Sequence, residues 1–258
     1  MNYNSEVPSY AFTSPHPGCD CYGYCVDASV CACLQLSQGP NYSQSERTLL
    51  QLQVPQGRFQ RPVFECSSQC ACKLGTCRNR LVQYFKDDTS ALHLFTAGEK
   101  GLGVRATRDI RQGEFVCAFS GYHTSQMTAK IISDAQYSIW NHVYVMIVRE
   151  FIGENIHPVF ESAVDGACEA IDNCAPHPLT RWPPSAFINH SCQPNMTVIP
   201  VRIESSKAYL TLFAIRDIRE GEELTYDYTE RSREVGGQTD RNCLCGSSSC
   251  RGFLPNCI

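Results

Sequence analysis

The stretch FINHSCQPN, residues 187–195, places an amide, an imidazole, a hydroxyl and a thiol at four consecutive positions, Asn189 to Cys192. Three interpretations of this cluster are open: a Cys/His nucleophile, a metal site, or another kind of binding site. A catalytic thiol at Cys192 would need a neighbouring base and an oxyanion site. The choice depends on the rest of the cysteines, because the chain contains 17 of them.

The cysteine content sets this chain apart from an ordinary soluble protein. Its 258 residues include 17 cysteines, and residues 1–18 show no basic start followed by an apolar run, the pattern of an export signal. Clustered cysteines in a reducing compartment favour metal ligation over disulfide bonds. An extracellular protein rich in disulfides stays as an alternative, and it predicts no bound zinc.

Charge and hydropathy argue against two classes of partner. The 22 basic and 26 acidic side chains form no stripe of Lys and Arg, so direct, sequence-specific binding to nucleic acid is not expected. The longest mainly apolar stretch, HVYVMIVREFI at 142–152, is too short and too charged to cross a bilayer. No membrane association is expected, whereas a basic peptide substrate is compatible with this charge.

Nine cysteines form two arms, at residues 19–33 and 66–77. A Cys-x-Cys unit in extended backbone directs both sulfurs to the same side, which suits thiolates that share neighbouring metal ions. Zinc prefers four ligands, so nine cysteines can hold three zinc ions if three sulfurs each bridge two ions. One or two separate four-cysteine zinc sites with spare thiols remain the alternative. The predicted ligands are Cys19, Cys21, Cys25, Cys31, Cys33, Cys66, Cys70, Cys72 and Cys77.

Short alternating runs after residue 81 indicate a β-rich core of small sheets. The clearest helical pattern is SQMTAKIISDAQYSI, residues 125–139. RATRDIRQGE and FAIRDIREGE are alike, but a single echo does not indicate a repeat array. The strand-like runs include LVQYF (81–85), EFVCAFSG (114–121), AYLTLFAIRDI (208–218) and ELTYDY (223–228).

Five motifs in unbroken order identify a family. They are CRNRLVQ (77–83), KGLGVRATRDIRQGEFV (100–116), FINHSCQPN (187–195), GEELTYDY (221–228) and CLCGSSSC (243–250). Together with the nine cysteines they resemble a SET-domain histone-lysine methyltransferase with pre-SET and post-SET segments. Within that family the chain is most similar to the suppressor-of-variegation class and to the SET half of the SET-mariner fusion methyltransferases.

The resemblance implies a mainly β SET fold, in which small curved sheets surround a pseudoknot-like C-terminal threading. A zinc-cluster pre-SET segment precedes this fold and a zinc-binding post-SET tail follows it. The expected division is a disordered tail at 1–18, a pre-SET domain with three zinc ions at 19–80, a SET catalytic domain at 81–228, and a linker with the post-SET zinc segment at 229–258.

The resemblance also implies roles for single residues. Tyr228 would orient the substrate amine, Tyr226 would set the width of the lysine channel, and Tyr137 would line the channel or the cofactor site. Cys192 would complete a fourth zinc site with Cys243, Cys245 and Cys250, which makes it a structural ligand and not a nucleophile. The expected cofactor-binding residues are Lys100, Gly101, Leu102, Gly103, Tyr137, Asn189, His190 and Phe253.

The activity that the resemblance implies is methyl transfer from S-adenosylmethionine to a lysine of histone H3, with lysine 9 favoured and lysine 36 open. A tyrosine at 226 narrows the channel and favours mono- and dimethylation. The implied partners are the histone H3 tail and the nucleosome, the implied location is the nucleus and chromosome, and a monomer is expected. Ala186, where the family usually has Arg, and the Pro-rich residues 173–185 depart from the pattern, so a chromatin-binding module with weak turnover stays as the alternative.

Overall fold

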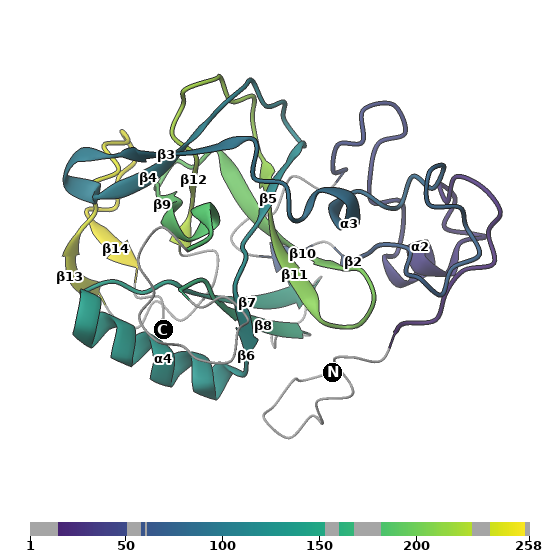
Figure 1. The fold of residues 1–258 in the computed structure, drawn as a ribbon, viewed down its shortest axis with the longest axis horizontal. Coiled ribbons are helices and arrows are strands. Elements are labelled where there is room, and N and C mark those ends of the chain that lie inside the picture. The colour runs from purple at the N-terminus through teal and green to yellow at the C-terminus, as the bar shows by residue number, and fades with distance from the viewer. Residues whose placement is uncertain are drawn as a thin grey trace.

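The computed structural model describes residues 15–50, 58–59, 61–152, 160–167, 182–228 and 238–255. Most of the tail predicted at 1–18, most of the departing segment 173–185 and most of the linker after 229 lie outside these residues. Figure 1 shows a β-rich body with a cysteine-rich lobe beside it, which carries α2 (Ala32–Leu36). No helix in this part of the chain is long and apolar enough to span a membrane.

The centre of the body is a six-stranded sheet. Its strands follow the order β5-β11-β10-β12-β9, and β2 pairs with β10 off this path. All seven residues of β10 are buried, and Met196, Val198, Ile199 and Val201 belong to the main hydrophobic core. The strands are β5 (Phe115–Ala118), β11 (Ala208–Ala214), β10 (Met196–Arg202), β12 (Thr225–Tyr226), β9 (Asn189–His190) and β2 (Val63–Phe64).

The strand β12 passes between two strands that follow each other in the chain. It lies between β9 and β10 and runs parallel to both, so residues 191–195, which join β9 to β10, must cross over it (Figure 1). Asn195 fastens the crossing, because its Nδ2 donates to the Glu223 carbonyl at 2.8 Å and its Oδ1 accepts from the Thr225 N–H at 2.9 Å. The predicted mainly β fold with a pseudoknot-like threading is confirmed.

A second sheet and two hairpins complete the body. The sheet has the order β1-β7-β8-β6, and α4 (Gln126–Trp140) packs on it through Ala129, against Val145 and Ala163. Ser125 caps this helix by accepting a bond from the Thr128 N–H at 3.1 Å, so the predicted helix at 125–139 is confirmed. The remaining elements are β1 (Arg58–Phe59), β7 (Val145–Ile152), β8 (Phe160–Asp165), β6 (Tyr122–Thr124), the hairpins β3 (Leu92–Thr96) with β4 (Leu102–Ala106) and β13 (Gln238–Asn242) with β14 (Phe253–Pro255), and the 3-10 turns η2 (Gly98–Lys100) and η4 (Pro184–Phe187).

The strand predicted for LVQYF is wrong, because this segment forms the short helix α3 (Val82–Phe85). Buried Glu65 accepts hydrogen bonds from the Leu81 N–H at 2.6 Å and the Val82 N–H at 2.7 Å. A carboxylate at this position satisfies the first N–H groups of a helix and stabilises its dipole. The capping residue Glu65 precedes Cys66, whereas the helix follows Cys77. The alternation of apolar residues within LVQYF could therefore not reveal the cap.

The two similar stretches noted in the sequence meet in space. Ile110 and Ile218 exchange two backbone hydrogen bonds of 2.8 Å each. The Gln112 N–H donates to Asp217, and the Glu220 N–H donates to Asp109, also at 2.8 Å. The echo is therefore a reciprocal pair of turns that holds the edges of the body together, and not part of a repeat array.

One ion pair is buried between the two sheets. Arg202 in β10 and Glu150 in β7 have side-chain exposures of 0% and 1%, and Nη1 of Arg202 donates to Oε2 of Glu150 at 3.1 Å. The guanidinium also lies 4.0 Å from the centroid of the Phe160 ring. Because each charge depends on the other for compensation, this contact fixes one sheet against the other.

Replacing Arg202 by methionine is expected to lower the free energy of unfolding by about 3–5 kcal/mol, because the Glu150 carboxylate stays buried without its cation. The double variant Arg202→Met/Glu150→Leu should recover part of this loss, since it removes both charges. Arg108→Met breaks an exposed pair with Glu114 and should cost less than about 1 kcal/mol. Urea denaturation measures all three, and an Arg202→Met protein as stable as the wild type would contradict the expectation.

Candidate functional site

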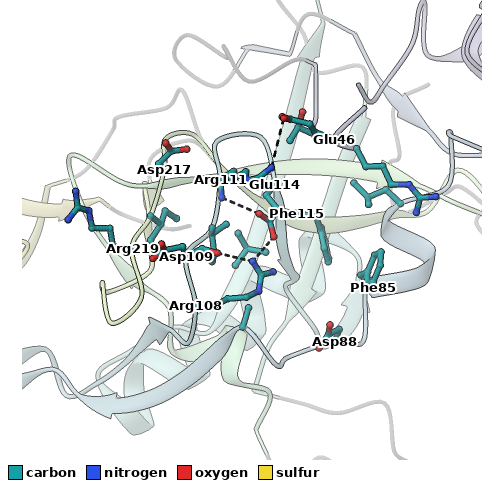
Figure 2. Close-up of a pocket in the computed structure, with 17 residues that line it drawn as sticks. Glu46, Phe85, Asp88, Arg108, Asp109, Arg111, Glu114, Phe115, Asp217 and Arg219 are labelled. Atoms are coloured by element: carbon teal, nitrogen blue, oxygen red, sulfur yellow. Dashed lines mark hydrogen bonds and ion pairs between the residues drawn. The ribbon is translucent and has the colours of Figure 1, made fainter. Parts of the chain in front are cut away.

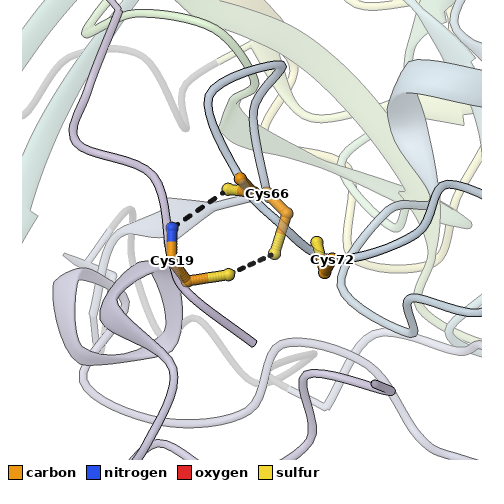
Figure 3. Close-up of side chains that lie close together, drawn as sticks. Cys19, Cys66 and Cys72 are labelled. Carbon is orange, nitrogen blue, oxygen red and sulfur yellow. Dashed lines mark hydrogen bonds between the residues drawn. The ribbon is translucent and has the colours of Figure 1, made fainter. Parts of the chain in front are cut away.

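The nine N-terminal cysteines, called here the N-terminal cysteine cluster, gather around a common centre. Figure 3 shows the side chains of Cys19, Cys66 and Cys72 converging from the two arms. The Sγ atoms of Cys19 and Cys66 are 4.0 Å apart, and those of Cys33 and Cys70 are 3.4 Å apart. All 14 cysteines in the described residues are free thiols, which disfavours the disulfide-rich alternative.

These spacings fit zinc. Four sulfurs at about 2.3 Å from a tetrahedral zinc ion lie roughly 3.8 Å from one another, and the cluster contains several quartets whose sulfurs all lie within 4.8 Å. The quartets share members, and Cys19 and Cys66 each occur in three of them. Five of the nine side chains are less than 2% exposed or fully buried, so thiolates there need a cation to compensate their charge.

The thiols perturb one another, as expected for groups built to ligate metal. Hydrogen bonds from Cys25 and Cys66 lower the pKa of the Cys77 thiol to about 3, although burial opposes this change. Burial raises the pKa of the Cys72 thiol to about 11. Cys25 has a left-handed backbone with φ of 49°, a conformation that costs energy for a residue other than glycine.

A second quartet, called here the C-terminal cysteine site, joins Cys192 to Cys243, Cys245 and Cys250. The Sγ atoms of Cys192 and Cys243 are 3.8 Å apart although 51 positions separate them in the chain. This site therefore ties the C-terminal hairpin to the strand β9 that precedes Cys192. The arrangement agrees with Cys192 as a structural ligand: His190 Nε2 lies 3.2 Å from its Sγ, but three further thiols surround the same sulfur.

The glycine-containing turn lies against Asn189. Gly101 has φ of 80°, which favours glycine, and a Cβ added to Gly103 would meet Asn189 Nδ2 at 3.0 Å. Asn189 Nδ2 donates to the Leu102 carbonyl and to Glu223 Oε1, both at 3.0 Å. The structure thus brings together the turn and Asn189, as the sequence predicted.

Glu223 holds both sides of this group, and the sequence analysis did not assign it a role. Its carboxylate pairs with the Lys100 ammonium as well as with the Asn189 amide. Both N–H groups of the Asn189 amide are used inside the protein, so its Oδ1 is the atom left for a ligand that donates hydrogen bonds. The sequence signal that could have identified Glu223 was its acidic side chain within the motif GEELTYDY.

Tyr226, Tyr228 and His190 form a second group beside the first. The ring centroids of Tyr226 and Tyr228 are 4.9 Å apart, and those of His190 and Tyr228 are 5.3 Å apart. Tyr226 is buried, and the Tyr228 hydroxyl donates to the Ile188 carbonyl at 2.9 Å. Because β9 and β12 pair directly, with Asn189 opposite Thr225 and His190 opposite Tyr226, the two groups lie on the same pair of neighbouring strands.

Tyr137 and Phe253 come from elements outside the knotted sheet. Tyr137 lies on α4 and is 45% exposed, and Phe253 lies on β14 and is 41% exposed. Their roles stay predictions. A cluster that the sequence analysis missed stands nearer the motif, where Trp182 stacks on Phe187 at 5.8 Å and meets Tyr144 at 4.6 Å.

A cavity of about 850 Å³ lies elsewhere. It opens between the paired turns, α3 and the segment around Glu46 (Figure 2). Arg108 pairs with Glu114 at 2.7 Å, and Arg111 faces Glu46 at 3.9 Å. Its charged side chains compensate one another, and it contains none of the predicted site residues, so this cavity is a junction between segments and not the candidate site.

Comparison with known proteins agrees with this geometry. The SET domain family matches residues 101–229 and the Pre-SET motif matches residues 1–80. The histone-lysine N-methyltransferase SETMAR of Bos taurus is 34% identical over 249 residues, covering 93% of this chain and 74% of that protein. KMT1 of Fusarium mangiferae, an H3 lysine-9 specific histone-lysine N-methyltransferase, is 34% identical over 203 residues, covering 75% and 56%.

Solved structures show the same fold. The methyltransferase domain of human SETMAR aligns with a TM-score of 0.70 and 30% identity over 99% of this chain and 86% of that one. KRYPTONITE in complex with DNA, an H3(1-15) peptide and SAH aligns with a TM-score of 0.63 and 25% identity, covering 98% and 50%.

A knotted β-sheet between a cysteine cluster and a four-cysteine site defines the SET-domain class of proteins, and the sequence matches support it over most of the chain. The likeness is to curated enzymes, and it extends along both cysteine-rich segments. The chain belongs to the SET-domain histone-lysine N-methyltransferases.

Proposed function

We propose that this protein transfers a methyl group from S-adenosylmethionine to a lysine of histone H3 in nuclear chromatin. Lysine 9 is favoured by the similarity to an H3 lysine-9 specific enzyme, and lysine 36 is the alternative. The similarity to a structure that contains an H3 peptide and SAH supports both the substrate and the cofactor. The observation that carries the proposal is the Tyr226–Tyr228 pair beside Asn189 on the knotted sheet.

The residues of the site position the substrate amine for reaction. S-adenosylmethionine would supply an electrophilic methyl group, and only the neutral lysine amine can attack it. Burial against aromatic rings lowers the pKa of such an amine. The Tyr228 hydroxyl already donates to the Ile188 carbonyl, so its oxygen can only accept from the amine N–H, which aims the amine lone pair. Alignment of this kind can supply most of the acceleration.

The cofactor would bind to the first group of residues, the turn from Lys100 to Gly103 and Asn189. The Asn189 Oδ1, left over after both amide N–H groups are used, suits the ammonium of the methionine part. The turn from Lys100 to Gly103 would bring backbone groups close to the cofactor, because Gly103 leaves no room for a side chain there. His190, Tyr137 and Phe253 complete the proposed cofactor-binding residues.

We propose three zinc ions in the N-terminal cysteine cluster and one in the C-terminal cysteine site. Two quartets, Cys19-Cys21-Cys25-Cys31 and Cys25-Cys66-Cys72-Cys77, share Cys25. The two remaining sulfurs, of Cys33 and Cys70, are 3.4 Å apart and belong to quartets with Cys19 and Cys66. The bridging ligands are therefore Cys19, Cys25 and Cys66, and the metal would also compensate the strained backbone at Cys25.

Purified, zinc-loaded protein tests the proposal on an array of histone H3 peptides with labelled cofactor. Label is expected on a peptide that contains lysine 9, or on one that contains lysine 36, and substitution of that lysine by arginine in the peptide should abolish it. A protein that binds SAH and H3 peptide but transfers no label would instead be the chromatin-binding module that the departures at Ala186 and residues 173–185 left open.

The hydroxyl of Tyr226 is expected to limit the product to mono- and dimethyl-lysine. Tyr226 is 3% exposed and packs against Tyr228, so Tyr226→Phe removes one atom from a closed wall and widens the channel. Mass spectrometry of the peptide product should show trimethyl-lysine appearing with Tyr226→Phe. Abundant trimethyl-lysine from the wild-type protein would contradict this role.

Glu223→Gln is expected to weaken SAH binding about tenfold, because it removes the charge that holds Lys100 and leaves one acceptor oxygen for two donors, the Lys100 ammonium and the Asn189 amide. Isothermal calorimetry with SAH measures the change. Glu220→Gln alters an exposed residue of the neighbouring turn and should bind like the wild type. If the two variants bind SAH equally, Glu223 does not contribute to cofactor binding.

A further inference from the structure

The C-terminal cysteine site contacts the end of β12 through one ion pair. Arg251 follows the ligand Cys250, and its Nη2 donates to Asp227 Oδ1 at 2.7 Å. The backbone N–H of Arg251 also donates to Cys192 Sγ at 3.4 Å. Asp227 immediately precedes Tyr228, and its side chain is only 15% exposed. A single residue thus touches both a metal ligand and the neighbour of the proposed catalytic tyrosine.

His190 makes a second connection between the same two places. The Tyr228 N–H donates to His190 Nδ1 at 3.1 Å, so in a neutral ring the proton lies on Nε2. That atom is 3.2 Å from Cys192 Sγ, which would accept the bond as a metal-bound thiolate. With a proton on Nε2, the 3.3 Å approach of Arg251 Nη2 to that atom is not a hydrogen bond, whereas the same Nη2 donates to Asp227.

We infer that the Arg251–Asp227 ion pair is a positioning device that makes the placement of Tyr228 depend on metal loading of the C-terminal cysteine site. Both connections act at the peptide group between Asp227 and Tyr228, one through the Asp227 side chain and the other through the Tyr228 N–H. The aromatic ring then stands where the Ile188 carbonyl can accept its hydroxyl proton. The inference rests on the proposed function, since it assigns Tyr228 to catalysis, and it adds Arg251 and Asp227 as positioning residues.

The same residues act on the metal. Groups that hydrogen-bond metal ligands orient them, and replacing such groups lowers metal affinity about 10–100-fold. Arg251 and His190 both contact Cys192, so loosening the Arg251 side chain loosens the ligand as well. Coupling between the tyrosine and the metal is therefore expected in both directions.

The test uses the full chain with Arg251→Gln, Asp227→Asn, the double variant and Arg251→Lys. Arg108→Gln is the matched control, because Arg108 also pairs with a carboxylate at 2.7 Å, far from the site. The measurements are kcat and KM for an H3 peptide, the Kd of SAH, and zinc affinity of the C-terminal cysteine site by competition with a chelator. For Arg251→Gln we expect kcat to fall about 10–100-fold with KM little changed, and zinc affinity to fall about tenfold.

The outcomes separate this inference from the proposed function. If the pair acts as a unit, the double variant is no worse than either single variant, and Arg251→Lys, which keeps the cation, recovers part of kcat. An Arg251→Gln protein with the kcat and zinc affinity of Arg108→Gln, or fully additive losses in the double variant, would overturn the inference. If the wild type methylates no H3 peptide, the proposed function fails, while zinc affinity and SAH binding still decide whether the pair couples the two sites.

Discussion

Tyr228→Phe is expected to lower kcat for methylation of an H3 peptide by about 100-fold or more, comparable to the loss of one oriented polar group in other active sites. The hydroxyl is the only atom removed. In the native site it donates to the Ile188 carbonyl at 2.9 Å, which leaves its oxygen to accept from the substrate amine. Without that acceptor the amine enters the channel in many orientations, and few of them place its lone pair in line with the methyl carbon.

Single-turnover kinetics and SAH calorimetry distinguish this effect from unfolding. The loss of one hydrogen bond to Ile188 should cost only about 1 kcal/mol of folding free energy, and SAH should bind as before. Tyr209→Phe changes a half-buried tyrosine of β11 and should leave kcat within about twofold. A Tyr228→Phe enzyme with wild-type kcat would show that the amine is oriented by other groups.

The fold could be predicted where the determining interactions are local in sequence or carried by ligand chemistry. Cysteine spacing identified the N-terminal cysteine cluster, because Cys-x-Cys units bring sulfurs together whatever the rest of the chain does. The helix α4 was predicted from the pattern of residues 125–139, and in the structure Ser125 caps it. The strand predicted for LVQYF was wrong because its conformation depends on Glu65, a carboxylate at the start of the 66–77 arm, 16 positions before Leu81.

The candidate site was predicted in its motifs but not in its connections. Tyr228 lies beside His190 and Tyr226, and β12 pairs with the strand of Asn189 and His190, while the roles of these residues stay predictions. The contact of Glu223 with Lys100 joins residues 123 positions apart, and that of Arg251 with Asp227 joins residues 24 positions apart. Charged residues in polar stretches of the sequence could each pair with many oppositely charged residues. Only the path of β12 through the sheet shows which pairs form.

Cys66→Ser is expected to remove the zinc of the N-terminal cysteine cluster and to unfold the protein. Cys66 is 0% exposed and is a proposed bridging ligand, so its loss disturbs two ions at once. Structural zinc contributes on the order of 10 kcal/mol to folding, which equals the whole stability of a typical domain at about 5–15 kcal/mol. Elemental analysis should give four zinc ions in the wild type, and fewer than two in Cys66→Ser.

Two other cysteines make this prediction specific. Cys117 is buried in the main core and belongs to no quartet, so Cys117→Ser should keep all four ions. Cys250→Ser should lose only the ion of the C-terminal cysteine site, and with it kcat, while the thermal melt stays near that of the wild type.

The N-terminal cysteine cluster cannot unfold by itself, because the residues before Cys66 belong to the main sheet. The Glu65 N–H donates to the Arg202 carbonyl at 2.7 Å, and β2 pairs with β10 next to the buried Arg202–Glu150 contact. Loss of the bridged zinc therefore removes an edge strand from the sheet that carries β12 and Tyr228. A Cys66→Ser protein that melts cooperatively at the wild-type temperature, or a wild type with far fewer than four zinc ions, would show that metal does not hold this lobe in place.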